Sequence, residues 1–300
     1  MDMDSYPFST DPYRLRGRAF SIVGSMTSDS QWRDAALVSG RLSSWAFTNS
    51  ILIAAQHRLE AERFDGMPAD PTLLASKPQW ARMGRYPKDG RTPYRIVEQD
   101  GTTLTTRYVF DVSQTDGEPF LQLAPSKPSA TVFASMLDAM CEDLNVQPQA
   151  DADPDMDPEL VDPADRIHST ALLIARTLVA DDVPESLAET AALTAACMVC
   201  GAVGCDTAVD PFGFETGAEG LLLCGGVARK AARRIIAYCG RGTGYRDGSM
   251  LAPPPSSSDG AGLADMGEEA AMDVEPATAS LIGLDNPVPP VQSIDFGGLE

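Results

Sequence analysis

The sequence lacks the marks of an exported or membrane-inserted protein. Its first four residues alternate between methionine and aspartate, from Met1 to Asp4, and they form neither the basic start nor the apolar core of a signal peptide. We find no uninterrupted apolar run of membrane-spanning length. Six cysteines in 300 residues, most of them in apolar segments, do not indicate a disulfide framework. We therefore expect a cytoplasmic protein with reduced thiols and no membrane partner.

Positive charge is also scarce, and it is unevenly placed. The chain has 23 Lys and Arg against 43 Asp and Glu, a formal net charge of −20. Residues 126–300 carry 9 basic against 28 acidic side chains, near −19, whereas residues 1–125 carry 14 against 15, near −1. Such a protein repels nucleic acid at long range, so any DNA binding must depend on a local basic surface.

One basic island interrupts this acidic background. Between Lys77 and Arg107 the chain has seven Lys and Arg against three acidic residues, a local charge of +4. Residues 94–99 and 102–112 are rich in β-branched and aromatic side chains, and the Asp100-Gly101 dipeptide between them predicts an antiparallel hairpin. Just upstream, residues 87–91 predict a turn that carries cations.

Aromatic rings set among cations are typical of proteins that hold single-stranded nucleic acid without sequence preference. We therefore predict that five cations of the island contact phosphates: Arg82, Arg85, Lys88, Arg91 and Arg95. Tyr86 and Tyr94 are the predicted stacking residues, and Trp80 is compatible with either base stacking or a core position. Of Tyr108 and Phe110 on the second strand, we expect one to pack against the helices.

The same region resembles a known family in four blocks that occur in one order. These blocks are Asn49–Gln56 (NSILIAAQ), Trp80–Arg85 (WARMGR), the Lys88–Arg91 turn (KDGR) and Val109–Gly117 (VFDVSQTDG). Over residues 15 to 120 the chain is similar to the single-stranded-DNA-binding N-terminal domain of ArdC-type antirestriction proteins. The resemblance implies a protein of a plasmid, phage or other mobile element that binds the entering single strand and protects it from host restriction or nucleases.

Helix-forming patterns flank the hairpin and predict an α+β fold. Ser28 to Ser30 offer cap residues to a helix from about Gln31, with a break near Gly40, and a second helix covers about residues 49–63. Asn49 and Gln56 on that second helix either bond to the backbone or help to shape a DNA groove. A helix over residues 132–145 is expected to pack on the N-terminal domain. Asp111 and Asp116 lack a histidine or metal-ligand partner, so we expect a structural role for them.

The predicted organisation has five parts. Residues 1–26 form a flexible arm in which Arg14, Arg16 and Arg18 are more simply solvated than bound to phosphate, and residues 27–146 form the DNA-binding domain. Residues 147–163 are an acidic linker without the glycine and glutamate of an EF-hand loop. A helical domain covers residues 164–240, with helices at 167–179, 184–203 and 219–238. Residues 241–300 have the composition of a disordered acidic tail, which could compete with DNA or dock a host or replication protein.

The ArdC-type resemblance also implies a zinc metallopeptidase scaffold in the C-terminal half. Such an enzyme needs an HExxH helix, but the matching text here is Leu172 to Arg176 (LLIAR), which lacks both histidines and the glutamate. Glu189 matches the third ligand, and a single carboxylate does not retain zinc. We therefore expect no enzyme activity, no catalytic residue, no metal and no cofactor.

Two alternatives stay open at this point. Cys197, Cys200 and Cys205 could hold a metal, although small buried cysteines in an apolar run more often pack as hydrophobic side chains. The strongly acidic C-terminal half could make the protein an interaction module that binds a host restriction or repair enzyme. The basic residues of the last predicted helix, Arg229 to Arg234, are expected to form a solvated face.

Overall fold

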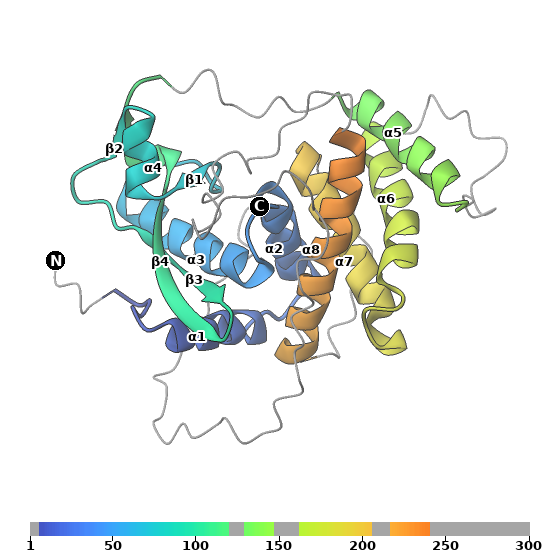
Figure 1. The fold of residues 1–300 in the computed structure, drawn as a ribbon, viewed down its shortest axis with the longest axis horizontal. Helices are drawn as coiled ribbons and strands as arrows, with labels where there is room; N and C mark the ends of the chain where they lie inside the picture. Colours follow the sequence, from blue (N-terminus) through green and yellow to red (C-terminus); the bar gives the residue numbers. More distant parts are fainter. Residues whose placement is uncertain (1–5, 120–128, 147–161, 206–216, 241–300) are drawn as a thin grey trace, which may run out of the picture.

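The computed structural model describes residues 6–119, 129–146, 162–205 and 217–240, and these residues form an α+β fold, as predicted. Helices α1 to α3 and a small antiparallel sheet lie on one side of the molecule, and helices α5 to α8 lie on the other (Figure 1). The predicted linker at 147–161, the loop at 206–216 and the tail at 241–300 lie outside the described residues.

Helix α1 (Pro12–Gly24) stands where a flexible arm was predicted. Asp11 caps its first turn by accepting hydrogen bonds from the backbone N–H groups of Tyr13 and Arg14, and Pro12 suits the first helical position. The apolar side chains of α1 recur at helical spacing and are buried: Leu15, Ala19, Ile22 and Val23. The arm prediction is therefore wrong for α1, because burial of this apolar stripe fixes the helix against the core.

Helices α2 (Asp29–Arg41) and α3 (Phe47–Arg63) confirm two predicted helices. Ser28 caps α2, with its hydroxyl accepting from the backbone N–H of Gln31 at 3.3 Å. Helix α2 ends at Arg41, one residue after Gly40, which agrees with the break predicted near that glycine. Gly40 also permits a close approach, since a Cβ atom there would lie 1.9 Å from the carbonyl oxygen of Met198.

The predicted hairpin consists of β3 (Tyr94–Asp100) and β4 (Thr103–Asp111). Asp100 pairs with Thr103, so the two-residue turn is Gly101-Thr102, one residue later than predicted, and Gly101 adopts the positive φ of 56°. The short strand β1 (Leu74–Ala75) pairs with the end of β4 and gives the sheet order β1-β4-β3.

A second, two-stranded sheet lies beside the end of β4. It is formed by β2 (Arg85–Pro87), which follows the short helix α4 (Lys77–Arg82), and by β5 (Thr115–Gly117), which follows the 3-10 turn η2 (Val112–Gln114). Between β2 and β3 the predicted turn is present, with Arg91 N–H bonded to the Lys88 carbonyl at 3.2 Å and Gly90 at φ 78°.

The helical half consists of α5 (Ala130–Asp143), α6 (Pro163–Val179), α7 (Glu185–Val203) and α8 (Ala218–Gly240). The last three confirm the predicted helices within a few residues. Helix α5 packs on α6 and α8, so the expectation that it covers the N-terminal domain is wrong. Its buried Phe133, Leu137 and Met140 belong to the same hydrophobic cluster as the inner faces of α6 and α8.

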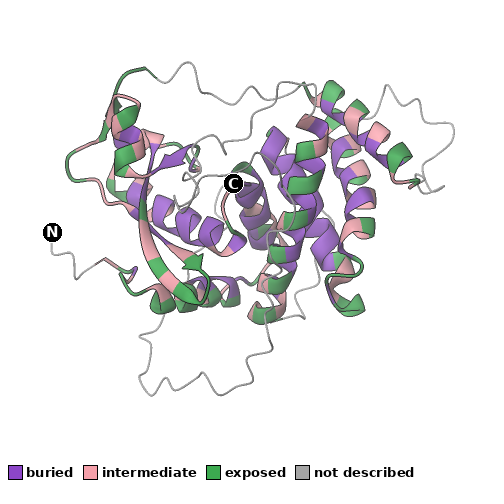
Figure 2. Cartoon of the chain, in the orientation of Figure 1, coloured by how far each residue is buried: buried purple, intermediate pink, exposed green. Residues whose placement is uncertain are grey.

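Helices α2 and α7 join the two sides of the molecule through a pair of glycines. Gly201 of α7 faces the backbone of α2, where an added Cβ would lie 2.1 Å from the carbonyl oxygen of Leu37, and Gly40 faces α7 in the same way. Glycine at both contacts lets the two backbones approach closely. One connected hydrophobic core therefore runs from α1, α2 and α3 through α7 into α6 and α8 (Figure 2).

Helix α7 is long and apolar enough to span a membrane by length and composition alone. The sequence expectation that no such segment exists is therefore wrong. In the structure α7 is the central helix, packed against α2, α6 and α8, and its residues from Thr190 to Val203 are buried. A core position accounts for its composition, because a helix buried on all sides is hydrophobic all round.

Candidate nucleic-acid interface

Two amide side chains of α3 close the open edge of β3. Asn49 donates from Nδ2 to the Val97 carbonyl at 2.7 Å and accepts the Val97 N–H at Oδ1 at 2.9 Å. Gln56 bonds the Arg95 carbonyl and N–H in the same way, at 2.9 and 2.8 Å. Each amide thus substitutes for a residue of a neighbouring strand. Asn49 and Gln56 are buried, so the groove-shaping role is corrected in favour of backbone bonding.

Three of the residues predicted to bind DNA point into the protein. Trp80 is fully buried and donates from Nε1 to the Phe110 carbonyl at 2.9 Å, which fixes α4 to β4. Tyr94 is fully buried, and its hydroxyl bonds Nδ1 of His57 at 2.8 Å. Burial also raises the pKa of Tyr94. These contacts correct the predicted stacking roles of Trp80 and Tyr94, since a ring in the core presents no face to a base.

Arg95 is the third inward residue. It is 3% exposed, its guanidinium donates to the Phe8 carbonyl, and the guanidinium carbon lies 4.9 Å from the centre of the Tyr6 ring. Because Tyr94, Arg95 and Ile96 are all buried, both faces of β3 are covered at this end of the strand. The predicted contact between Arg95 and phosphate is therefore wrong: the guanidinium holds the N-terminal segment against the sheet.

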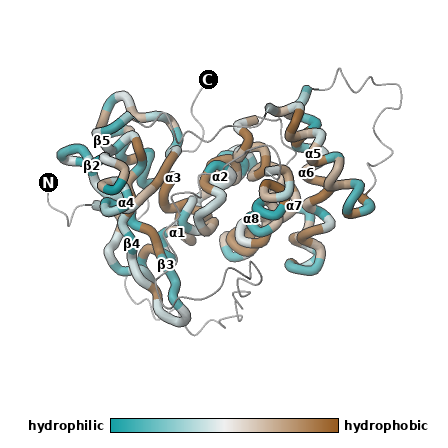
Figure 3. The backbone as a smooth tube through the Cα atoms, turned by 45° about the horizontal axis from the view of Figure 1, so that its top comes forward, coloured by the Kyte–Doolittle hydropathy of each residue, from teal (hydrophilic) through white to brown (hydrophobic). Residues whose placement is uncertain are grey.

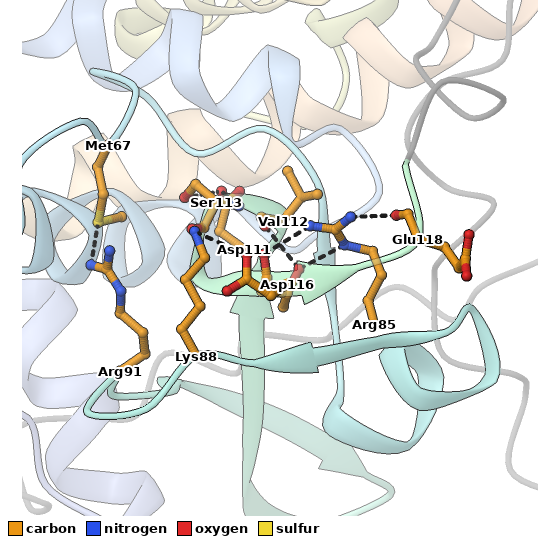
Figure 4. Close-up of polar contacts among 10 residues, drawn as sticks. Met67, Arg85, Lys88, Arg91, Asp111, Val112, Ser113, Asp116 and Glu118 are labelled. Carbon is orange, nitrogen blue, oxygen red and sulfur yellow. Dashed lines mark hydrogen bonds and ion pairs between the residues drawn. The ribbon is translucent and has the colours of Figure 1, made fainter.

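Two further cations, Arg85 and Lys88, are engaged in fixing the second sheet (Figure 4). Arg85 donates to the hydroxyl and carbonyl oxygens of Thr115 at 2.9 and 2.8 Å and to the Glu118 carbonyl at 2.5 Å. Lys88 donates to the Ser113 carbonyl at 3.0 Å and lies 3.7 Å from a carboxylate oxygen of Asp116. Arg85 and Lys88 thereby hold β5 and η2 against β2, and they keep only part of their surface for a ligand.

Arg91 is held on the other side of the same turn. Its guanidinium carbon lies 3.7 Å from the centre of the Phe64 ring, and Nη1 contacts the sulfur of Met67 at 3.1 Å. The guanidinium is half-buried by this stacking. Arg91 therefore packs the turn onto the end of α3, and it is less available to phosphate than its place in the sequence indicates.

The exposed remainder of the predicted set lies on α4 and β2. Tyr86 is 58% exposed on β2, and Arg82 is exposed at the end of α4. Lys77, also exposed, begins the same helix. Among the described residues neither Lys77 nor Arg82 forms an ion pair. Figure 3 shows mainly hydrophilic colouring around β2 and β5, in contrast to the hydrophobic α3. We name Lys77, Arg82, Tyr86 and Lys88 the Tyr86 surface.

Sequence reasoning missed other exposed rings. Six large hydrophobic side chains are exposed in the described part of the chain, and four of them are aromatic: Tyr13, Phe20, Tyr86 and Tyr108. All four lie on α1, β2 or β4. Phe110 is buried beside Trp80 whereas Tyr108 is exposed, which agrees with the expectation that one of the two packs inward. The signal that could have found α1 is its apolar stripe, which leaves Tyr13 and Phe20 on the opposite face.

Asp111 has the structural role that was predicted for it. It is fully buried, and its carboxylate accepts hydrogen bonds from the backbone N–H groups of Thr72, Leu73 and Ser113 at 2.7 to 3.1 Å. Gln114 accepts the Asp111 N–H at 2.9 Å and donates to the Thr92 carbonyl. This network ties β1, β4 and the turn before β3 together.

The residues at the expected zinc-peptidase positions do not fit a metal. Arg176 stands where the second histidine of the motif would lie, and its guanidinium makes two hydrogen bonds to the carboxylate of Glu189 at 3.0 and 2.6 Å. The carboxylate that would ligate zinc is therefore paired with a cation. No group of three or more His, Cys, Asp or Glu in the described ranges could hold a metal ion. Arg176 and Glu189 therefore form an ion pair at the surface, and together with Leu172 they do not make a set of zinc ligands.

The cysteines of α7 belong to the core. Cys197 and Cys200 are fully buried among the helices, and Cys205 is half-buried just after the helix end. Burial raises the pKa of the Cys197 thiol, and the neighbouring Cys200 adds to that rise. A raised pKa favours the neutral thiol, and both Cys197 and Cys200 pack in the hydrophobic core as small apolar side chains.

Comparison with known proteins gives a distant structural likeness. Neither a protein-family model nor a curated protein matches the sequence. Among solved structures, the chain is similar to the metal-free crystal structure of the antirestriction ArdC protein from plasmid R388. The identity is 15% and the TM-score 0.41, over 65% of this chain and 85% of that chain. A likeness of this size assigns neither a family nor an activity.

Proposed function

We propose that this protein binds single-stranded DNA through the Tyr86 surface and protects the strand by covering it. The observation that carries the proposal is Tyr86 itself, an aromatic side chain left 58% exposed on β2, the strand that follows α4 with its exposed Lys77 and Arg82, in a chain of net charge −20. A ring in that position contributes little to the core. It offers the flat apolar face on which an unpaired base stacks, at about 1 to 3 kcal/mol per base.

The cations supply the second half of the interaction. Lys77 and Arg82 carry no ion pair within the described residues, so they meet phosphates without first giving up a carboxylate partner. Arg85 and Lys88 act mainly by fixing β5 and η2 to β2, which holds the backbone on either side of Tyr86 in place. A ring on a fixed strand loses little conformational entropy when it stacks.

A binding role without catalysis is part of the proposal. The Arg176–Glu189 ion pair occupies the positions at which the ArdC-type resemblance expects metal ligands. Because an arginine cannot ligate zinc, this pair supports a protein that acts by covering DNA. An antirestriction role on a mobile element follows from the same resemblance. In that role a covered single strand would be withheld from host nucleases until its complement is made.

The test is fluorescence anisotropy of the full chain with labelled single-stranded and double-stranded oligonucleotides. We expect the parent to bind the single strand more tightly, and Tyr86→Ala to weaken that binding roughly 5- to 150-fold, the equivalent of one lost stacked base. Arg82→Ala should reduce the salt dependence of log K by about one phosphate contact. Lys230→Ala on α8, an exposed cation far along the chain, is the matched control and should bind as the parent does.

The proposal fails if the parent does not bind single strands at low salt. It also fails if Tyr86→Ala binds as well as the parent, because the surface then does not contact the DNA.

A further inference from the structure

Helix α1 is cationic in an acidic protein. Its 13 residues contain three arginines and no Asp or Glu. Arg14 and Arg16 are exposed, and neither forms an ion pair within the described part of the chain. Arg18 is half-buried against the ring of Phe8. The inner face of α1 already supplies its contacts with the core, so folding does not require the composition of the outer face.

The outer face of α1 presents two aromatic rings. Tyr13 is 66% exposed and Phe20 is 48% exposed. They are seven residues apart, which places them on the same side of the helix about 10 Å apart along its axis. Arg16 lies on that side too. Gly17 lies between the rings, and a Cβ atom there would meet nothing within 4 Å. The surface between the two rings is therefore open.

This glycine has a cost that the fold does not explain. Glycine inside an exposed helix is about 1 kcal/mol less favourable than alanine. At Gly40 and Gly201 the close approach of another backbone explains why glycine is needed, but no described residue lies against Gly17. An exposed ring, an open stretch and a second ring form a surface on which flat groups can lie.

The exposed Tyr108 lies on β4 between the contacts that this strand makes with the segment before α1 and with α4. Thr106 donates from its hydroxyl to the Thr10 carbonyl at 2.8 Å, so the segment leading into α1 lies on β4 at Thr106. At Phe110, the β4 carbonyl accepts from the Trp80 ring of α4 at 2.9 Å. Alternate residues of a strand share a face, so Tyr108, which is 43% exposed, lies midway on a span of about 13 Å.

We propose that a single strand bound at the Tyr86 surface continues past Tyr108 onto the outer face of α1. There Tyr13 and Phe20 stack on bases, while Arg14 and Arg16 neutralise phosphates. This inference rests on the proposed function and extends its site. Single-stranded DNA is the ligand that uses both kinds of side chain, because phosphates match the arginines and unpaired bases match the rings.

Other ligands fit this face less well. A membrane surface would require the apolar face of α1, and that face is buried in the core. An acidic polypeptide, including the acidic residues 241–300 of this chain, would pair with the arginines but would leave the rings unused. Removal of the two rings therefore distinguishes single-stranded DNA from these other ligands.

The experiment compares the parent with a Tyr13→Ala, Phe20→Ala double variant in anisotropy titrations with single strands of about 20 nucleotides. The matched control is a Val132→Ala, Leu223→Ala double variant, which removes the two exposed aliphatic side chains of the helical half. We expect the α1 variant to lose at least tenfold in affinity and the control to bind as the parent does. A separate Phe20→Trp variant keeps a ring at this position. It should bind as the parent does, and its tryptophan fluorescence should be quenched when the strand is added.

A second arm uses an abasic oligonucleotide of the same length. Rings that stack on bases have nothing to stack on there, so the α1 variant and the parent should bind it equally. Equal losses on both oligonucleotides would overturn the stacking inference. An α1 variant that binds the normal strand as tightly as the parent, while Tyr86→Ala does not, would overturn the α1 inference and leave the proposed function standing. A parent that binds no single strand would overturn both.

Discussion

Different interactions stabilise the sheet side and the helical side of the molecule. Around the sheet, polar side chains bond directly to backbone groups, as Gln56 does at Arg95 and Asp111 does at Leu73. Among the helices, small residues let backbones approach, as Gly201 does against Leu37. The difference shows that a polar residue in the first region is mostly structural, and that in the second region the absence of a side chain is itself structural.

The two sides also differ in the exposed side chains that are available to a ligand. In the sheet region the polar and aromatic residues that are buried make the fold, and those that remain exposed are gathered on α1, β4 and β2. The helical half has exposed cations on α8 but no exposed aromatic ring among its described residues. Rings and free cations occur together on the sheet side alone within the described chain, which is why the proposed DNA contacts lie there.

The largest expected effect comes from filling the glycine contact of the helical half. Gly201→Ala places a methyl group against the Leu37 carbonyl, and because that neighbour is backbone, α2 and α7 must move apart. We expect a loss of about 3 kcal/mol or more in the free energy of unfolding, measured by urea denaturation. Gly226→Ala is the matched control. It lies on the exposed face of α8, where a Cβ would meet nothing within 4 Å, and it should be neutral or slightly stabilising. Equal behaviour of the two variants would contradict the close approach.

Removing the edge closure of β3 should have a smaller effect. Gln56→Ala leaves the buried N–H and carbonyl of Arg95 without their amide partner, and we expect a cost of about 2 kcal/mol. Gln99→Ala provides the comparison, because Gln99 is exposed at the end of the same strand and bonds only locally, to Gly101. If both variants unfold at the same urea concentration as the parent, the amide does not support the sheet.

The smallest expected effect is a difference in alkaline stability. Burial raises the pKa of Cys224 from 9.0 to about 11 and that of Cys239 to about 12. The folded state therefore keeps protons that the unfolded state releases, so the stability is fully present below pH 9 and falls as the pH rises toward 11. Between pH 8 and 10, Cys224→Ala should lose about 1 kcal/mol less than the parent.

The buried tyrosines offer the counterpart on the sheet side. The pKa values of Tyr6 and Tyr94 are raised by burial from 10.0, so their contribution to stability begins to fall about one pH unit higher than that of the cysteines. A parent whose stability stays constant up to pH 10 would show that the cysteines are accessible to water.

The sequence predicted the elements better than it predicted their surroundings. Periodicity and turn residues located α2, α3, α6, α7, α8 and the hairpin, since these signals are local. Burial of Trp80, Tyr94 and Arg95 could not be predicted in the same way. Each is covered by a segment distant in sequence, such as the Phe8 carbonyl at Arg95, and alternation along one strand does not reveal a helix that covers its second face.

The same limit explains the shift of the candidate site. Composition identified the basic island correctly as a feature of the sequence, but hydrogen bonds to carbonyl oxygens engage Arg85 and Lys88, and a ring engages Arg91. Among the rings and cations between Lys77 and Arg107, the exposed ones are Lys77, Arg82 and Tyr86. Conversely, the arginines of α1 alone predict a solvated arm, whereas the apolar stripe between them predicts a packed helix.

The close contact of α2 with α7 has a consequence for synthesis on the ribosome. Trp32 of α2 is completely covered in the finished protein, and its indole N–H donates to the hydroxyl of Thr194, 162 residues later in the chain. Until α7 emerges, the nascent chain has to carry that tryptophan and its neighbours uncovered. Late closure of this kind slows folding and favours association between unfinished chains, so chaperone engagement should peak before residue 203 leaves the exit tunnel.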